Sequence, residues 1–118
     1  MLKVFILGNS GAGKSTFASK LSSILSADGV SVRVISAGGW ARIKYPDLNG
    51  AALGERAVAD LSDNPNVAID YIRSHIPVNG ICIIEGIRNP RDLAILMDPK
   101  NDLVIHLTCS QDTYNFNN

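Results

Sequence analysis

The sequence predicts a doubly wound α/β fold, in which helices cover both faces of one parallel sheet. Two observations predict it. Four short runs of β-branched and aliphatic residues have the length of buried strands, and helical stretches separate them. Near-continuous apolar strands joined by helical crossovers are typical of parallel sheets, because right-handed crossovers place helices against the faces of the sheet. We therefore expect three layers, α/β/α.

The expected elements alternate along the chain. Strands are expected at 3–7, 31–35, 80–84 and 103–107, and helices at 14–27, 51–76 and 90–97. Asp28 and Gly29 close the first helix, and a break is expected in the second near Asn64. Asn89 is the expected cap of the last helix, with Pro90 at its first position. Residues 1–118 are expected to form one domain, with a helical insert at 38–77 and a frayed end at 113–118.

Composition limits the function classes. The 118 residues are 46% hydrophobic, which suits one modest core. Eleven basic and eleven acidic residues cancel, so broad electrostatic binding to nucleic acid or to a membrane surface is not expected. No apolar run approaches the ~20 residues of a membrane span, and we expect a cytoplasmic protein. Cys82 and Cys109 lie beside apolar runs without CxxC spacing, and we interpret both as core thiols.

Glycine-rich and charged segments follow the first three expected strands. They occupy residues 8–15, 36–39 and 85–88. In open α/β sheets, ligands bind beyond the carboxyl ends of the strands. We therefore expect these three segments to meet at one edge of the sheet and to form a binding site.

The segment GNSGAGKS at 8–15 fits the pattern G-x-x-x-x-G-K-[ST], directly after an expected strand and before an expected helix. Its glycines let backbone N–H groups and the helix N-terminus face phosphates. The motif predicts a P-loop that binds ATP, or another nucleoside triphosphate, together with Mg²⁺. Lys14 is expected to reach the β- and γ-phosphates, Ser15 to ligate Mg²⁺, and Thr16 to meet the α-phosphate. The expected nucleotide contacts are Gly8, Asn9, Ser10, Gly11, Ala12, Gly13, Lys14, Ser15 and Thr16. The alternative is a glycine-rich turn with an incidental lysine.

Glu85 ends the third apolar run. P-loop proteins place at this point a carboxylate that positions Mg²⁺ or polarises a nucleophile. Both roles stay open for Glu85, as an outer partner of the metal or as a general base. The alternative is a solvated acid at a strand end, which suits Asp28, Asp63 and Asp98 better because these lie in turn-like contexts.

Three segments in order carry a family resemblance: 8–16, 36–42 (SAGGWAR) and 83–88 (IIEGIR). Over residues 1 to about 108, the chain resembles the nucleoside monophosphate kinases, the adenylate and cytidylate kinase group of P-loop phosphotransferases. The resemblance implies a P-loop NTPase fold and an acceptor site in the helical insert at 38–77. It implies that Arg42, together with Ser36 and Gly38, holds a monophosphate acceptor. Arg88 is implied to contact the transferred or the acceptor phosphate.

The residue types agree with such a site independently. A kinase brings two anionic substrates together, and the planar fork of arginine suits phosphate oxygens. Arg42 and Arg88 both follow expected strands at the ligand edge, where Lys14, Glu85 and Arg88 are the expected catalytic set. For Arg91 two interpretations stay open, since its side chain could reach the same pocket or face solvent.

Four other side chains are interpreted mainly as structural. Arg73 is expected on a solvated helical face. Trp40 either flanks a base or packs on the helical region. His75 and His106 have no partner at metal-ligand spacing, and we interpret both as structural.

The sequence departs from the family pattern after the fourth strand. Family members continue there with an arginine-bearing lid, a further strand and a helix, whereas this sequence has no arginine after Arg91. Loss of a finger-type arginine can cost ~10³ to 10⁵ in rate, so slow turnover by this chain alone is expected. The apolar strand at 103–107 is then expected at a sheet edge, which favours pairing. A homodimer, a partner that supplies a strand, or a truncated product of a longer gene would each account for it.

The sequence favours an ATP- and Mg²⁺-dependent phosphotransferase that acts on a nucleoside or deoxynucleoside monophosphate or on a similar small phosphorylated acceptor. A P-loop hydrolase of ATP is a second hypothesis. A GTPase is disfavoured, because the sequence has no N-K-x-D segment. A third hypothesis is a nucleotide-binding module that no longer catalyses or that needs a partner.

Overall fold

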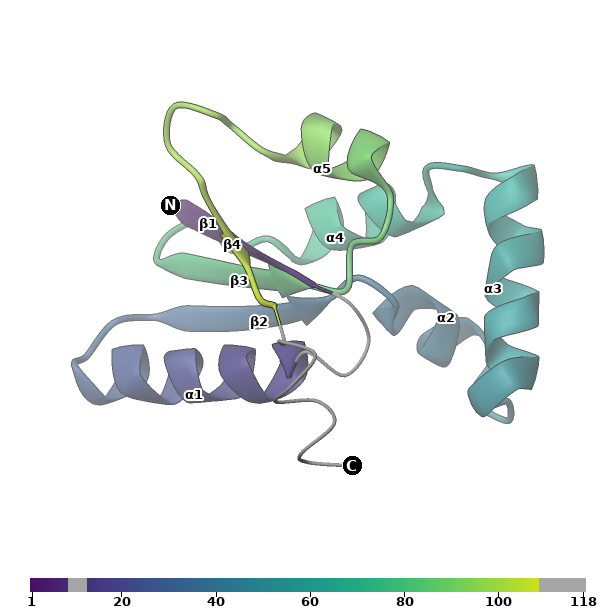
Figure 1. The fold of residues 1–118 in the computed structure, drawn as a ribbon, viewed down its shortest axis with the longest axis horizontal. Helices are drawn as coiled ribbons and strands as arrows, with labels where there is room; N and C mark the ends of the chain where they lie inside the picture. Colours follow the sequence, from purple (N-terminus) through teal and green to yellow (C-terminus); the bar gives the residue numbers. More distant parts are fainter. Residues whose placement is uncertain (9–12, 109–118) are drawn as a thin grey trace.

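A computed structural model describes residues 1–8 and 13–108 of the chain. The predictions for Asn9, Ser10, Gly11 and Ala12, for Cys109 and for the end 113–118 lie outside the described residues. The described chain is an α/β structure, with a four-stranded parallel sheet between helices (Figure 1).

All four strands run parallel in the order β2-β3-β1-β4. They are β1 (Leu2–Leu7), β2 (Val32–Ser36), β3 (Ile81–Glu85) and β4 (Leu103–His106). Each expected strand is confirmed to within one residue at either end. Among the described residues β4 lies at an edge of the sheet, and Leu103 and Val104 are exposed there.

The helices are α1 (Lys14–Ala27), α2 (Gly39–Lys44), α3 (Gly50–Asp63), α4 (Val67–His75) and α5 (Pro90–Leu96). The break near Asn64 is confirmed, because α3 and α4 are separate helices. The Asn89 side chain accepts a hydrogen bond of 2.9 Å from the backbone N–H of Arg91, which confirms the expected cap of α5. Helix α2 was not among the helices expected at 14–27, 51–76 and 90–97. It has six residues and begins at a glycine, so it shows no apolar period that identifies a helix.

Helices cover both faces of the sheet, as expected. Alternate residues of β1 enter opposite cores, since Val4 and Ile6 pack with Ala18 of α1, whereas Phe5 packs with residues of α4 and α5. Figure 1 shows α1 on one side of the sheet and α4 and α5 on the other. Cys82 is fully buried in the second core, and burial raises the pKa of its thiol to about 11. It is therefore a core thiol, as predicted.

The insert between β2 and β3 lies largely beyond the carboxyl ends of these strands (Figure 1). Helix α3 packs against α2 and α4, and none of its residues is fully buried. None of the helices that the described residues form is long and apolar enough to span a bilayer.

Candidate functional site

The carboxyl ends of β1, β2 and β3 meet at one edge of the sheet. Ile6 and Ser36 are both register partners of Glu85, one on each side of it. The backbone N–H of Ala37 donates a hydrogen bond of 2.8 Å to the carbonyl of Glu85. Gly86 follows with φ 89°, a conformation that glycine adopts without strain, and this turns the chain away from the sheet. The three segments after the strands therefore start from one place, as the sequence predicted.

The connection from β1 to α1 is closed at its ends by a side chain. Lys14 Nζ donates a hydrogen bond of 2.7 Å to the carbonyl of Gly8 at the exit of β1. Gly13 precedes the helix with φ 83° and ψ 26°, a left-handed conformation that suits glycine. The first N–H groups of a helix have no partner within the helix, and the helix dipole makes that end favourable for an anion. Lys14, Ser15 and Thr16 are the first residues of α1 and stand at that end.

A hollow of about 340 Å³, lined mainly by serine residues of α1, lies between α1 and β2. Ser15 and Glu85, the two residues predicted to bind metal, both line it. The other lining residues are Ala18, Ser19, Ser22, Ser23 and Val34. Glu85 is half-buried and forms no ion pair with another described residue.

The oxygen donors that Ser15 and Glu85 offer to this hollow suit Mg²⁺ chemically. A hydroxyl and a carboxylate are the oxygen donors that a hard cation prefers. The described residues contain no cluster of three or more His, Cys, Asp or Glu side chains. A metal here would therefore take its remaining oxygens from water and from phosphates, which is the usual coordination of Mg²⁺ beside a nucleotide.

A second hollow, of about 390 Å³, lies between the insert and the turn from β3 to α5. We call it the apolar hollow, because most of its lining side chains are hydrocarbon. It is lined by Ala37, Gly38, Trp40, Ala41, Gly54, Ala57, Val58, Leu61, Pro65, Ala68, Ile72, Gly86, Ile87, Arg88, Asn89 and Asp92.

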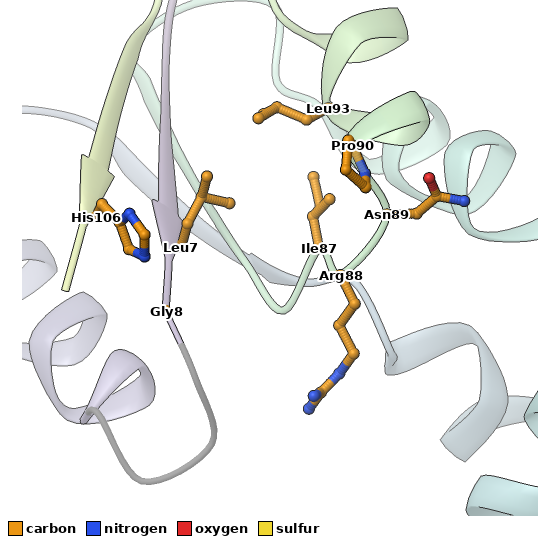
Figure 2. A pocket seen from close by; sticks show the side chains of 8 residues that line it. All are labelled: Leu7, Gly8, Ile87, Arg88, Asn89, Pro90, Leu93 and His106. Carbon is orange, nitrogen blue, oxygen red and sulfur yellow. The ribbon is translucent and has the colours of Figure 1, made fainter. Parts of the chain in front are cut away.

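Arg88 stands between this apolar hollow and a third hollow of about 340 Å³. The third hollow also includes Gly8 at the end of β1 and His106 at the end of β4. Figure 2 shows the Arg88 side chain extending away from Pro90 and Leu93. Arg88 is exposed and forms no ion pair with another described residue. Its guanidinium is therefore available to an anion between the loop side and the insert side of the site.

Arg42 lies close to Ser36 and Gly38, the two residues predicted to bind the acceptor with it. Arg42 Nη2 donates a hydrogen bond of 2.9 Å to Ser36 Oγ at the end of β2. A Cβ added at Gly38 would meet Arg42 Nη1 at 3.7 Å, an ordinary contact, so the guanidinium also lies close to Gly38. Since Ser36 is the register partner of Glu85, Arg42 is held near the edge that carries the acid.

Arg91 lies outside this arrangement. Its guanidinium donates to Asn66 Oδ1 at 2.5 Å and pairs with Asp92 Oδ1 at 3.1 Å, so it ties α5 to the start of α4. The structure thereby assigns it to packing between helices and not to the predicted pocket.

The remaining candidates divide between packing and the hollows. Arg73 is exposed on α4, as predicted. The His75 ring contacts the ring of Tyr71 in a tilted arrangement, with ring centroids 4.4 Å apart, which agrees with a structural role. Trp40 is only 7% exposed and also lines the apolar hollow. It therefore packs against the helical region and forms part of the wall of this hollow. His106 is exposed and lines the third hollow with Arg88, so its structural role stays a prediction.

Sequence reasoning did not identify the residues that α3 contributes to the apolar hollow. Leu53, Ala57 and Leu61 are spaced four apart, which places them on one side of a helix. Ala57 and Leu61 line the hollow, together with Val58. The spacing therefore held a signal for the inward side of α3, although not for what it would face.

Neither the family models nor the curated proteins compared with this chain include a match. Solved structures do match, 18 chains in all. The crystal structure of APE1195 is one of them, with a TM-score of 0.56 and 23% sequence identity over 94% of this chain. The chain spans 64% of the length of that protein. At this identity the likeness concerns the fold, and it agrees with the parallel α/β arrangement described above.

Proposed function

We propose that this chain is an ATP- and Mg²⁺-dependent phosphotransferase with a P-loop NTPase fold of the nucleoside monophosphate kinase type. It moves the γ-phosphoryl group to a nucleoside or deoxynucleoside monophosphate or to a similar small phosphorylated acceptor. One observation carries the proposal. The segment that fits G-x-x-x-x-G-K-[ST] connects β1 to α1, and its Lys14 Nζ lies 2.7 Å from the carbonyl of Gly8, turned toward the loop.

The reaction needs positioning and charge neutralisation more than covalent chemistry from the protein. An oxygen of the acceptor phosphate bonds to the γ-phosphorus while the bond from that phosphorus to the β–γ bridging oxygen breaks. ADP leaves with the electron pair of the bridging oxygen. Lys14 would neutralise charge on the β- and γ-phosphates during this exchange.

Two further groups of residues would complete the site. Ser15 and Glu85 line one hollow and would hold Mg²⁺, which supplies further charge neutralisation when bound. Arg42 and Arg88 would hold the acceptor phosphate in line, because a guanidinium can donate two parallel hydrogen bonds to phosphate oxygens. Their places beyond β2 and β3 support this division.

An assay of ATP and Mg²⁺ with a panel of nucleoside monophosphates tests the proposal. ADP that forms only when an acceptor is present supports phosphotransfer. Phosphate release without an acceptor would instead identify a hydrolase. Tight ATP binding with neither product would identify a binding module.

The variant Lys14→Ala tests the assignment of the site. We expect a fall in acceptor-dependent ADP formation on the order of 10²-fold or more, since a charge partner of the transferring group is lost. Lys20→Ala is the matched control, because Lys20 is an exposed lysine on the same helix. Equal activities of the two variants would rule out the proposed role of Lys14.

A further inference from the structure

The apolar hollow differs in chemistry from a pocket that reads a nucleobase. The insert lines it with Trp40, Ala57, Val58, Leu61 and Ile72. Apart from the indole N–H of Trp40, the side chains that α2, α3 and α4 contribute carry no hydrogen-bonding group. Backbone groups in the middle of these helices are already used in helical hydrogen bonds. The insert side of the hollow is therefore suited to hydrocarbon.

The polar side chains of the hollow are gathered at its other end, at the turn from β3 to α5. They are Arg88, Asn89 and Asp92. Two of them are engaged, because Asp92 pairs with Arg91 at 3.1 Å and the Asn89 side chain caps α5. Arg88 has no acidic partner among the described residues and is the group left to bind an anion.

A nucleobase buried in this hollow would lose hydration at its edge. Its amide, amino and ring nitrogen groups need hydrogen-bond partners when they leave water, and each one left unpaired is costly. Sites that discriminate polar ligands do so with matching polar groups, which the insert side here does not offer. An apolar group of similar size would be buried without that penalty.

We propose that the acceptor is a monophosphate with a compact hydrocarbon body, of the isoprenyl or branched-alkyl type. Its body occupies the apolar hollow and its phosphate binds Arg88. Because Arg88 also lines the hollow that contains Gly8, the phosphate faces the loop between β1 and α1. This inference rests on the proposed phosphotransfer and specifies its acceptor.

Calorimetric titration of the full chain tests the inference, with isopentenyl monophosphate, CMP, AMP and inorganic phosphate as separate probes. We expect isopentenyl monophosphate to bind at least about tenfold more tightly than the other three, since only it combines the phosphate with a body that fits the walls. The sequence contains one tryptophan, and Trp40 lines the hollow, so its fluorescence reports whether the probe binds there.

A pair of valine variants locates the contact. Val58 lines the hollow and is 66% exposed, whereas Val78 is 95% exposed and lies outside it. Val58→Asn should weaken isopentenyl monophosphate binding about tenfold and leave MgATP binding unchanged. Val78→Asn should change neither affinity. Both valines are on the surface, so both variants are expected to fold.

The outcomes separate this inference from the proposed function. Tighter binding of CMP or AMP, with ADP formed from it, would overturn the hydrocarbon acceptor and leave the phosphotransferase standing. Equal binding of all four probes, or binding of none, would also overturn the inference. Selective binding of isopentenyl monophosphate that Val58→Asn weakens, without ADP formation, would support the ligand of the hollow and overturn phosphotransfer.

Discussion

The site has a loop side, at the connection from β1 to α1, and an insert side, formed by α2, α3 and α4. The two sides differ in how deeply their residues are buried. On the loop side, Gly8 directly follows β1, in which Val4, Phe5 and Ile6 are buried. Helix α1 packs on the sheet through the buried Ala18. On the insert side, α3 packs on other helices and buries no residue fully. Phosphate binding and transfer need groups held in fixed places, which a sheet core provides. A hydrocarbon body makes weaker geometric demands, and loosely packed helices can adapt to it.

The polar contacts that secure each side follow the same division. In the sheet, Asp102 receives a hydrogen bond of 3.0 Å from the backbone N–H of Lys3 and pairs with Lys3 Nζ at 3.0 Å, which joins the start of β4 to β1. The Asp102 side chain is only 2% exposed. In the insert, Asp60 of α3 accepts from Tyr45 at 2.7 Å and pairs with Lys44 at 2.9 Å. These two residues lie at the end of α2, and the Lys44 side chain is 56% exposed. Exposed ion pairs contribute little to stability, so α3 is the less firmly held part.

The largest expected effect comes from the sheet core. Ile83 of β3 is fully buried, and Ile83→Ala should lower the free energy of unfolding by about 2–5 kcal/mol, because it removes buried methyl groups and leaves a cavity. Val58→Ala on α3 should change it by less than about 0.5 kcal/mol. Urea denaturation of both variants measures the difference. Equal losses would mean that α3 is as firmly packed as the sheet.

Sequence patterns were sufficient for the sheet and for part of the site. Runs such as 80–84 identified buried strands because near-continuous apolar residues, with isoleucine at three of the five positions, fit a strand covered on both faces. Since parallel strands share their carboxyl edge, the strand assignments placed Glu85, Arg88 and the segments that contain Ser15 and Arg42 at that edge.

The insert was less predictable, because its packing depends on contacts between distant residues. The pattern around Trp40 is too short to show a helical period, so α2 was missed. Arg91 and Arg88 are equally charged and three residues apart, yet only Arg88 lines the hollows. Asn66, on the approach to α4, engages Arg91, and no local pattern indicates that contact. His106 likewise belongs to a hollow because its strand lies beside β1.

The second-largest effect on stability is expected at Asp102, which joins the start of β4 to Lys3 of β1. Burial alone would raise the pKa of Asp102, but hydrogen bonds from the backbone N–H groups of Asp98 and Lys3, together with the Lys3 ammonium, hold it below the ordinary 3.8. Asp102→Asn should therefore lower the free energy of unfolding at pH 7 by about 1–2 kcal/mol, measured by urea denaturation. Asp28→Asn is the control, since Asp28 is exposed after α1.

The pH dependence of this loss follows from the direction of the pKa shift. A carboxyl group whose folded pKa is lowered contributes stability above its unfolded pKa, and that contribution is lost as the pH falls through the folded value. The difference between the parent chain and Asp102→Asn should accordingly narrow below about pH 4. A difference that is constant from pH 7 to pH 3 would contradict a stabilising Asp102 carboxylate.

The smallest effect is expected where α3 meets α2. Hydrogen bonds from Lys44 and Tyr45 lower the pKa of Asp60, and the hydrogen bond to Asp60 raises the pKa of Lys44. Because the Lys44 side of this pair is solvent-exposed and the Asp60 side chain is less buried than that of Asp102, Asp60→Asn should lower the melting temperature less than Asp102→Asn does. Its effect should be local and appear as faster hydrogen exchange of the α3 amides, with those of β1 and β3 unchanged.

Asp63→Asn is the matched control for this regional effect, because Asp63 is an exposed acid on the same helix that forms no ion pair with a described residue. It should leave exchange in α3 unchanged. Equal acceleration of exchange in α3 and in the strands by Asp60→Asn would mean that α3 opens only when the whole chain unfolds. The insert would then be as rigid as the sheet, and an apolar acceptor would have to fit the hollow as it stands.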